Sequence, residues 1–318
     1  MKTGADDYRP SYIKLYESGE LQARRDDALA SLTCCRLCPR SCGVNRVSGE
    51  TGFCGIGGLA RVAAFNPHYG EESPLVGKKG SGTIFFSGCN LLCCFCQNHD
   101  ISHGREGVDV DREELASMML QLARSGCHNI NLVTPSHVVP QILEALVEAV
   151  PLGLDVPLVY NCGGYESVET LKLLDGVVDI YMPDFKFWDQ KWAERLCSAP
   201  DYRERACEAV SEMHRQVGFL ELDKDGIARR GLLVRHLVMP GDAGGTSNVL
   251  SFLVQTSGPE TYVNVMDQYR PCGTAEKIPP LDRRLTAQEY RSAISAAAAA
   301  GLSRLDRRDR PPLLFRLF

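Results

Sequence analysis

The sequence has no long hydrophobic run and no strong excess of charge of one sign. Its first residues, MKTGADDYRPSYIKLYESGE, lack the apolar segment of a signal peptide, and no stretch approaches the length of a membrane span. The 35 Lys and Arg residues against 40 Asp and Glu residues give a formal net charge of -5, which argues against a dedicated nucleic-acid binder. We therefore expect a cytoplasmic protein with no membrane partner and no nucleic-acid partner.

Cysteine, by contrast, is abundant, with 14 in 318 residues. Structural disulfides are disfavoured in the cytoplasm, so these thiols need another explanation. Most of them fall into two groups: Cys34, Cys35, Cys38, Cys42 and Cys54, and then Cys89, Cys93, Cys94 and Cys96. Such clustering indicates metal binding. We interpret the remaining cysteines as core or surface thiols: Cys127, Cys162, Cys197, Cys207 and Cys272.

From Thr83 onward, short apolar runs alternate with helical patterns. The runs are rich in Val, Ile and aromatic residues, which is typical of strands buried on both faces of a parallel sheet. They span residues 83–89, 129–134, 157–162, 178–186, 232–240 and 261–269. Six strand–helix repeats predict an α/β fold with a partial (β/α)6 barrel, and an open sheet is the alternative.

Helical patterns occupy the segments between these strands. Asp111 with Glu114, and Thr286 with Glu289, fit the capping-box pattern, and Gly301 fits a helix C-terminus. Further helices are expected at 137–149, at 168–174, twice within 189–217, and at 247–256. We divide the chain into a cysteine-rich N-terminal extension (1–80), a core barrel (81–275), and a C-terminal helix with a basic tail (276–318).

The second cysteine group follows the first predicted core strand. Cys89, Cys93 and Cys96 form a C-x3-C-x2-C arrangement. Thiolates are soft ligands that suit zinc or iron–sulfur clusters, and structural zinc normally takes four of them. Three cysteines instead suit a cubane with one iron open, and catalytic groups of barrels collect at the carboxyl ends of strands. Buried structural thiols, or half of a zinc site with a distant ligand, are the alternatives.

The segment GCNLLCCFCQN resembles the C-x3-C-x-aromatic-C signature of the radical S-adenosylmethionine (radical SAM) superfamily, with Phe95 at the aromatic position. The resemblance implies a radical SAM barrel with a [4Fe-4S] cluster on Cys89, Cys93 and Cys96. It also implies that S-adenosylmethionine chelates the fourth iron and is cleaved reductively to a 5′-deoxyadenosyl radical. A reduced donor such as flavodoxin or ferredoxin would supply the electron. Cys94 departs from this spacing, and we interpret it as a packing residue.

From Cys35 to Gln268 the chain resembles an uncharacterised branch of proteins similar to pyruvate formate-lyase activating enzymes. The segments that carry this likeness are NINLVTPSH, YNCGGYE, YMPDFK, RHLVMPG and MDQY. Where those activators have a Gly-Gly-Glu segment that binds the cofactor's amino group, this chain has Thr134, Ser136 and His137. Their side chains can accept the same hydrogen bonds. A loop and helix cap with Ser136 at the N-cap is the alternative.

Other strand ends carry further cofactor candidates through the same resemblance. Asp184 and Lys186 match an Asp-x-Lys segment that contacts the methionyl end, where a lysine can neutralise a carboxylate. His236 matches a histidine near the nucleoside, although a core role is an equal alternative. Asn161 and Gln268 lie at other strand ends and are candidates to line the same mouth.

Four cysteines of the N-terminal group, Cys35, Cys38, Cys42 and Cys54, have the spacing C-x2-C-x3-C-x11-C. This spacing fits a structural zinc ion or a second iron–sulfur cluster, and the sequence does not choose between them. Nearby glycines allow the tight turns of a metal knuckle. The alternative is a set of free thiols packed over the bottom of the barrel.

The resemblance suggests that the protein activates a glycyl-radical enzyme by removing a glycine α-hydrogen. Two departures weaken this hypothesis: the Gly-Gly-Glu segment is missing, and the region before the first core strand reads GKKGSGTIFF instead of a DGPGIR-like run. One alternative is radical chemistry on a small metabolite, a peptide or an RNA, with RNA the least attractive because of the acidic charge. Another is a zinc-binding scaffold without turnover.

Overall fold

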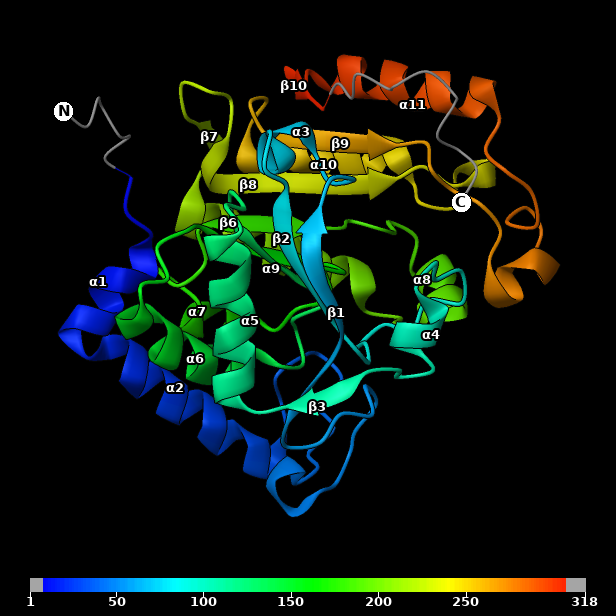
Figure 1. The fold of residues 1–318 in the computed structure, drawn as a ribbon. Helices are drawn as coiled ribbons and strands as arrows, with labels where there is room; N and C mark the ends of the chain where they lie inside the picture. The colour runs from blue at the N-terminus through cyan, green and yellow to red at the C-terminus, as the bar shows by residue number, and fades with distance from the viewer. Residues whose placement is uncertain (1–7, 307–318) are drawn as a thin grey trace.

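The computed structural model describes residues 8–306 of the chain, and their strands join in one mixed sheet (Figure 1). The strand order is β10-β9-β8-β6-β5-β4-β2-β1-β3, and β7 pairs with β8. The strand bounds are β1 (Ala60–His68), β2 (Ser81–Phe86), β3 (Val108–Val110), β4 (Ile130–Val133), β5 (Leu158–Cys162), β6 (Ile180–Pro183), β7 (Glu221–Leu222), β8 (Ala228–Leu237), β9 (Tyr262–Met266) and β10 (Arg304–Leu305).

The six predicted core strands are β2, β4, β5, β6, β8 and β9, and each is parallel to the next. β10 extends this run in parallel, whereas β1 pairs antiparallel with both β2 and β3 at the other end of the order. The expected α/β fold with a partial barrel is therefore confirmed, and it follows a cysteine-rich N-terminal region.

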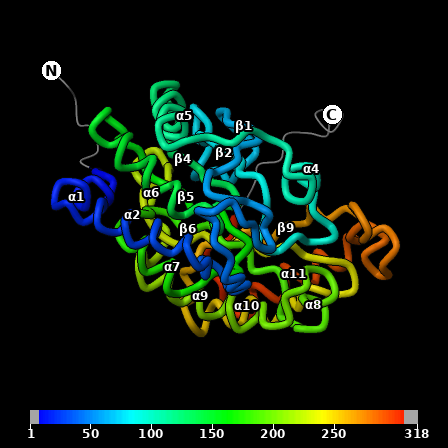
Figure 2. Tube along the Cα trace, turned by 90° about the horizontal axis from the view of Figure 1, so that it is seen from below, coloured from blue at the N-terminus to red at the C-terminus, as the bar shows by residue number. Residues whose placement is uncertain are grey.

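Helices surround this strand layer (Figures 1 and 2). The α-helices are α1 (Ser11–Ser18), α2 (Glu20–Ala30), α3 (Ser73–Val76), α4 (His99–Ser102), α5 (Arg112–Arg124), α6 (Val139–Ala149), α7 (Val168–Leu173), α8 (Gln190–Cys197), α9 (Tyr202–Val217), α10 (Thr246–Ser257) and α11 (Ala287–Ala300). Short 3-10 turns are η1 (Ser31–Cys34), η2 (Arg46–Ser48), η3 (Val150–Leu152), η4 (Pro240–Asp242) and η5 (Gly273–Lys277).

Both predicted capping boxes are present. The Asp111 side chain accepts from the Glu114 backbone N–H at the start of α5, and Thr286 does the same with Glu289 at the start of α11. In each, the glutamate side chain reaches back to the backbone of the cap residue, so two otherwise unpaired N–H groups are satisfied. Helix α11 ends at Gly301, which has a left-handed backbone, as expected.

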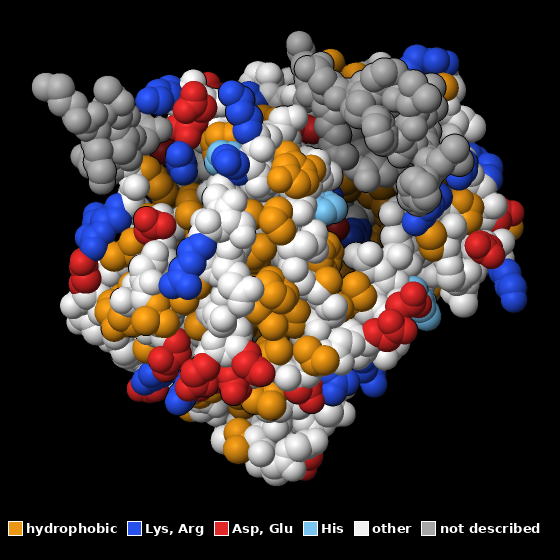
Figure 3. All heavy atoms as spheres, in the orientation of Figure 1, with side chains coloured by type: hydrophobic (Ala, Val, Ile, Leu, Met, Phe, Trp, Pro, Cys, Tyr) orange, Lys and Arg blue, Asp and Glu red, His pale blue; other side chains and the backbone are white. Residues whose placement is uncertain are grey.

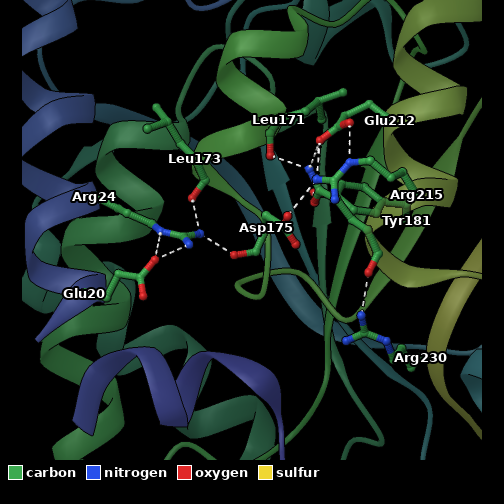
Figure 4. A network of polar contacts seen from close by, with 10 residues as sticks. Glu20, Arg24, Leu171, Leu173, Asp175, Tyr181, Glu212, Arg215 and Arg230 are labelled. Carbon is green, nitrogen blue, oxygen red and sulfur yellow. Dashed lines mark hydrogen bonds and ion pairs between the residues drawn. The ribbon is translucent and has the colours of Figure 1, made fainter. Parts of the chain in front are cut away.

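The N-terminal region contains two helices that the sequence patterns did not reveal. Figure 4 shows how α2 is fixed: Arg24 bonds Glu20 on its own helix and the backbone carbonyls of Leu173, the last residue of α7, and of Asp175 just after it. The Tyr12 hydroxyl of α1 donates to the Val156 carbonyl at 2.8 Å, so both helices are joined to the barrel wall. The proposed division at residues 80 and 275 stays a prediction. The basic tail lies, from residue 307 on, outside the described residues.

A polar network inside the barrel links β8 and β9 to the connection between β1 and β2. Arg235 of β8 lies 3.2 Å from a carboxylate oxygen of Glu72, which also accepts from the Asn264 amide of β9 at 2.6 Å. Arg235 also faces Glu71 at 3.5 Å and Asp184 at 3.7 Å. We call the contact of Arg235 and Asn264, on β8 and β9, with Glu72 of the β1–β2 connection the seam. It joins by side chains two parts of the wall that no strand pairing joins among the described residues.

No helix among residues 8–306 is long and apolar enough to cross a membrane. On the face shown in Figure 3, the basic and acidic side chains of the described residues are interspersed.

Candidate functional site at the carboxyl end of the strands

The loop that carries Cys89, Cys93 and Cys96 begins directly after β2. Leu92 has a left-handed backbone with φ of +50°, and the Cys96 N–H donates to the Cys93 carbonyl at 3.0 Å, so the loop turns tightly. Phe95 is buried and packs edge-on against Phe187 with ring centroids 5.9 Å apart. The aromatic residue of the motif therefore anchors the loop in the core, while Cys93 is buried and Cys89 and Cys96 are half-buried.

Each of the three thiols has a donor close by. The Leu91 N–H donates to Cys89 Sγ at 3.3 Å, and the Ser102 hydroxyl donates to Cys96 Sγ at 3.2 Å. Burial raises the pKa of Cys89 to about 12 and also raises the pKa of Cys96. The pKa of Cys93 is lowered, because Cys197 donates a hydrogen bond to it and Lys186 adds positive charge.

Cys197, at the end of α8, is a residue that the sequence did not assign to the site. Its sulfur lies 3.1 Å from Cys93 Sγ, and the Cys94 N–H donates to the Leu196 carbonyl beside it at 2.9 Å. Cys94 itself lies next to Thr274, whose hydroxyl bonds its sulfur, and burial raises its pKa. Cys94 thus has a partner that Cys89, Cys93 and Cys96 do not share, and its sulfur packs against η5.

No three His, Cys, Asp or Glu side chains in the described part of the chain are gathered as closely as the ligands of one metal ion. The alternative of a zinc scaffold requires four ligands around one ion at the 89–96 loop, and this arrangement is not found there. In an iron–sulfur cubane each cysteine binds a different iron, so its ligands stand further apart than those of a single ion. Three half-buried or buried thiols after one strand fit that donor set.

Lys186 and Asp184, after β6, form a half-buried ion pair at the same end of the barrel. Lys186 Nζ lies 2.5 Å from Asp184 Oδ2. Burial alone would lower the pKa of Lys186, but the charges of Asp184 and Cys93 raise it above its ordinary value. Burial likewise opposes the ionisation of Asp184, yet Lys186 and Arg235 keep its pKa low. The structure therefore brings the predicted Asp184 and Lys186 together with the cysteine loop.

The Thr134–His137 segment sends its side chains in different directions. Thr134, half-buried after β4, has φ of +60°, which is a strained backbone for a β-branched residue, and its N–H donates to the Asn161 carbonyl at 2.8 Å. The buried Ser136 hydroxyl donates to Glu166 at 2.5 Å. His137 Nε2 lies 2.8 Å from the Ser87 carbonyl, and burial lowers the pKa of His137 to about 4.

Helix α6 begins at Val139 with Val138 as its N-cap, so the alternative interpretation of Ser136 as the N-cap is wrong. The turn at Thr134 and the hydrogen bond to Glu166 direct Ser136 away from the helix end.

His236 is separated from the cysteine loop by its place on the outer side of β8. Its Nδ1 lies 2.7 Å from the Phe185 carbonyl and its Nε2 lies 2.9 Å from the Thr246 hydroxyl at the start of α10. Both ring nitrogens thus have partners in the core, and burial lowers the pKa of the ring. Asn161 is buried at the end of β5, and Gln268 is exposed after β9.

Glu166 is a second residue that the sequence patterns did not single out, although it ends the quoted YNCGGYE segment. It is 1% exposed and accepts hydrogen bonds from Ser136 and, at 3.0 Å, from the Tyr160 hydroxyl. Burial raises its pKa from 4.5 to about 7, although these hydrogen bonds oppose the shift. A buried glutamate with a raised pKa and polar partners is typical of a functional site, and only the structure shows that Glu166 has these properties.

The four N-terminal cysteines lie at the carboxyl end of the strands, next to the Cys89 loop. Cys35, Cys38, Cys42 and Cys54 line one small cavity together with His137. Figure 2 shows the segment that carries them, in blue, crossing the barrel at this end. The alternative that placed these thiols over the bottom of the barrel is therefore wrong.

Comparison with known proteins agrees with this architecture. The family described as the radical SAM superfamily matches residues 83–219. Over 270 residues the chain is 34% identical to "Uncharacterized protein MJ0674" of Methanocaldococcus jannaschii, and the match covers 83% of this chain and 74% of that protein.

Among solved structures, the radical S-adenosylmethionine methyltransferase TsrM from Kitasatospora setae, with cobalamin and a [4Fe-4S] cluster bound, matches with a TM-score of 0.41 and 16% identity. That match covers 59% of this chain and 36% of TsrM, or about a third of its length. The family match, together with the relative that is 34% identical over 83% of this chain, shows that the chain belongs to the radical SAM superfamily, whose members use a [4Fe-4S] cluster and S-adenosylmethionine.

Proposed function

We propose that Cys89, Cys93 and Cys96 ligate the [4Fe-4S] cluster of this radical SAM enzyme. The observation that carries the proposal is the convergence of the three motif cysteines after β2 with the half-buried Lys186–Asp184 pair after β6. When bound, the cluster supplies the electron that cleaves S-adenosylmethionine to methionine and a 5′-deoxyadenosyl radical. The chain holds the thiols, excludes water from Cys93 and places a lysine charge beside it.

Lys186 and Thr134 are the side chains that we assign to the cofactor. Lys186 is held charged by Asp184, so it can pair with the carboxylate of the methionyl group. The Thr134 hydroxyl is half-buried at the end of β4, and the strained backbone at this residue is typical of a functional loop. Ser136, His137 and His236 have other partners, so we expect them to act through packing rather than by contact with the cofactor.

We further propose that the substrate hydrogen comes from a glycine of a partner protein, as in enzymes that activate glycyl-radical enzymes. An open groove of about 470 Å³ adjoins Cys96 and supports this proposal, because an extended peptide segment fits an open groove better than an enclosed pocket. Its lining includes the charged residues Asp100, Arg270 and Glu276, which can orient such a segment. The electron donor would be a reduced flavodoxin or ferredoxin, and 14 free thiols suit the cytoplasm.

Uncoupled cleavage of S-adenosylmethionine tests the first proposal. The reconstituted, reduced protein should release 5′-deoxyadenosine, Cys93→Ala should abolish this release, and Cys94→Ala should leave it largely intact as the matched control. Unchanged release in Cys93→Ala would contradict the ligand assignment.

The second proposal is tested with candidate glycyl-radical proteins. Electron paramagnetic resonance should detect a glycyl radical after incubation with the reduced enzyme and cofactor. Cofactor cleavage without a glycyl signal on any of them would leave the radical chemistry in place and reject this substrate.

A further inference from the structure

The N-terminal cysteines form a second potential metal site. Cys35 and Cys54 are buried, Cys38 is half-buried and Cys42 is exposed. The site therefore lies just beneath the protein surface. The Phe53 N–H donates to Cys42 Sγ at 3.4 Å, and Gly52 lies so close that an added Cβ would come within 2.7 Å of that sulfur. The four cysteines therefore line one cavity, whose wall is completed by larger side chains such as Arg46, Phe53 and His137.

Two buried polar atoms in the wall of this cavity have no hydrogen-bond partner. Arg46 is 1% exposed, and its Nε and Nη1 donate to the carbonyls of Gly57 and His137, while Nη2 donates to nothing. His137 Nδ1 is also unpartnered. A buried guanidinium is a cation that needs a negative partner. Four thiolates with bound metal would supply that charge.

We propose that Cys35, Cys38, Cys42 and Cys54 ligate a second [4Fe-4S] cluster. Zinc would require the four sulfurs to surround one ion, whereas no three such ligands are gathered that closely within residues 8–306. A cubane takes one cysteine per iron and tolerates the wider arrangement.

The second site is in contact with the loop of the first. A Cβ added at Gly88, next to Cys89, would lie 2.7 Å from the Cys54 carbonyl, so the two loops pack backbone against backbone. Arg40, between Cys38 and Cys42, donates from Nε to the Asn90 carbonyl at 2.8 Å and from Nη2 to the Cys197 carbonyl at 2.7 Å. Cofactors bound at the two sites would therefore be neighbours at the same end of the barrel.

The test uses the full chain with the first site removed. In the triple variant Cys89→Ala, Cys93→Ala and Cys96→Ala, anaerobic reconstitution with ferrous iron and sulfide should still give about four iron and four sulfide per chain. Mössbauer spectra should show a cubane. Adding Cys38→Ala to this variant should remove the iron, and adding Cys34→Ser, which changes an exposed thiol outside the cavity, should not.

Three results would overturn the proposal: a folded triple variant that retains no iron, one that binds about one zinc ion in its place, or one that holds only two irons. Circular dichroism establishes that each variant is folded. The outcome is independent of the proposed function, because the triple variant reports only on the N-terminal cysteines. Loss of cofactor cleavage by Cys93→Ala reports only on the first site.

Discussion

Replacing Glu166 by glutamine measures what the protein loses by burying an ionised carboxylate. Burial raises the pKa of Glu166 from 4.5 to about 7, so the folded chain binds a proton that the unfolded chain releases across this range. A raised carboxyl pKa means that stability is highest below pH 4.5 and falls as the pH rises through 7. The shift of roughly 2.5 units corresponds to about 3 kcal/mol of unfolding free energy.

Glutamine keeps the shape of the protonated acid and cannot ionise. It can accept from the Ser136 hydroxyl as Glu166 does, while its amide group faces the Tyr160 hydroxyl. The Glu166→Gln variant should therefore be within about 1 kcal/mol of the wild type near pH 5 and more stable than it by about 3 kcal/mol at pH 8. For a chain of this size the melting temperature would differ by several degrees.

The assay is thermal unfolding of the metal-free, reduced protein between pH 5 and pH 8.5, at one scan rate. Glu221→Gln is the matched control, because Glu221 is exposed at the surface in β7. Its melting temperatures should run parallel to those of the wild type. If Glu166→Gln also ran parallel to the wild type across the whole range, the ionisation of Glu166 would not be the source of the pH dependence.

Four other substitutions address the caps and the two cysteine sites. Thr286→Ala removes the capping box of α11 and should cost about 1 kcal/mol in chemical unfolding, whereas Ser303→Ala, outside the helix, should cost less. Lys186→Gln should raise the KM for S-adenosylmethionine while iron content stays the same, and loss of iron would mean that Lys186 supports the cluster loop instead. Cys197→Ala should retain the iron, and its loss would make Cys197 a ligand. Arg46→Gln should lower the reduction potential of the second cluster in redox titration, because it removes a neighbouring positive charge, and Arg46→Lys should restore most of it.

The core strands could be predicted from the sequence because a parallel strand covered on both faces is a nearly continuous apolar run. β1 escaped prediction, since it is partly exposed and contains Pro67, which interrupts the pattern. Helix α2, ELQARRDDALA, is mostly polar and is joined to the barrel by Arg24 rather than by a broad apolar stripe. Its position therefore depends on carbonyl groups about 150 residues away in the chain.

Local spacing was enough to predict the cysteine loop, because all three thiols lie within eight residues. Cys197 could not be predicted, since only the fold brings α8 to within 3.1 Å of Cys93. The different roles of Thr134 and Ser136 could not be predicted either. They depend on the left-handed backbone at Thr134, and a sequence pattern indicates such a backbone mainly where a glycine is present.

The seam has a consequence for the range of molecules that this barrel can accept. Strands joined by main-chain hydrogen bonds keep a fixed spacing of about 4.8 Å, so a closed barrel has a bore set by its strand number. Here Arg235, Glu72 and Asn264 make the connection, and their side chains can change rotamer without breaking any strand pairing. The wall can therefore adjust at the seam to molecules of different size, and high salt should have little effect there, because Glu72 is fully buried and salt screens buried ion pairs only weakly.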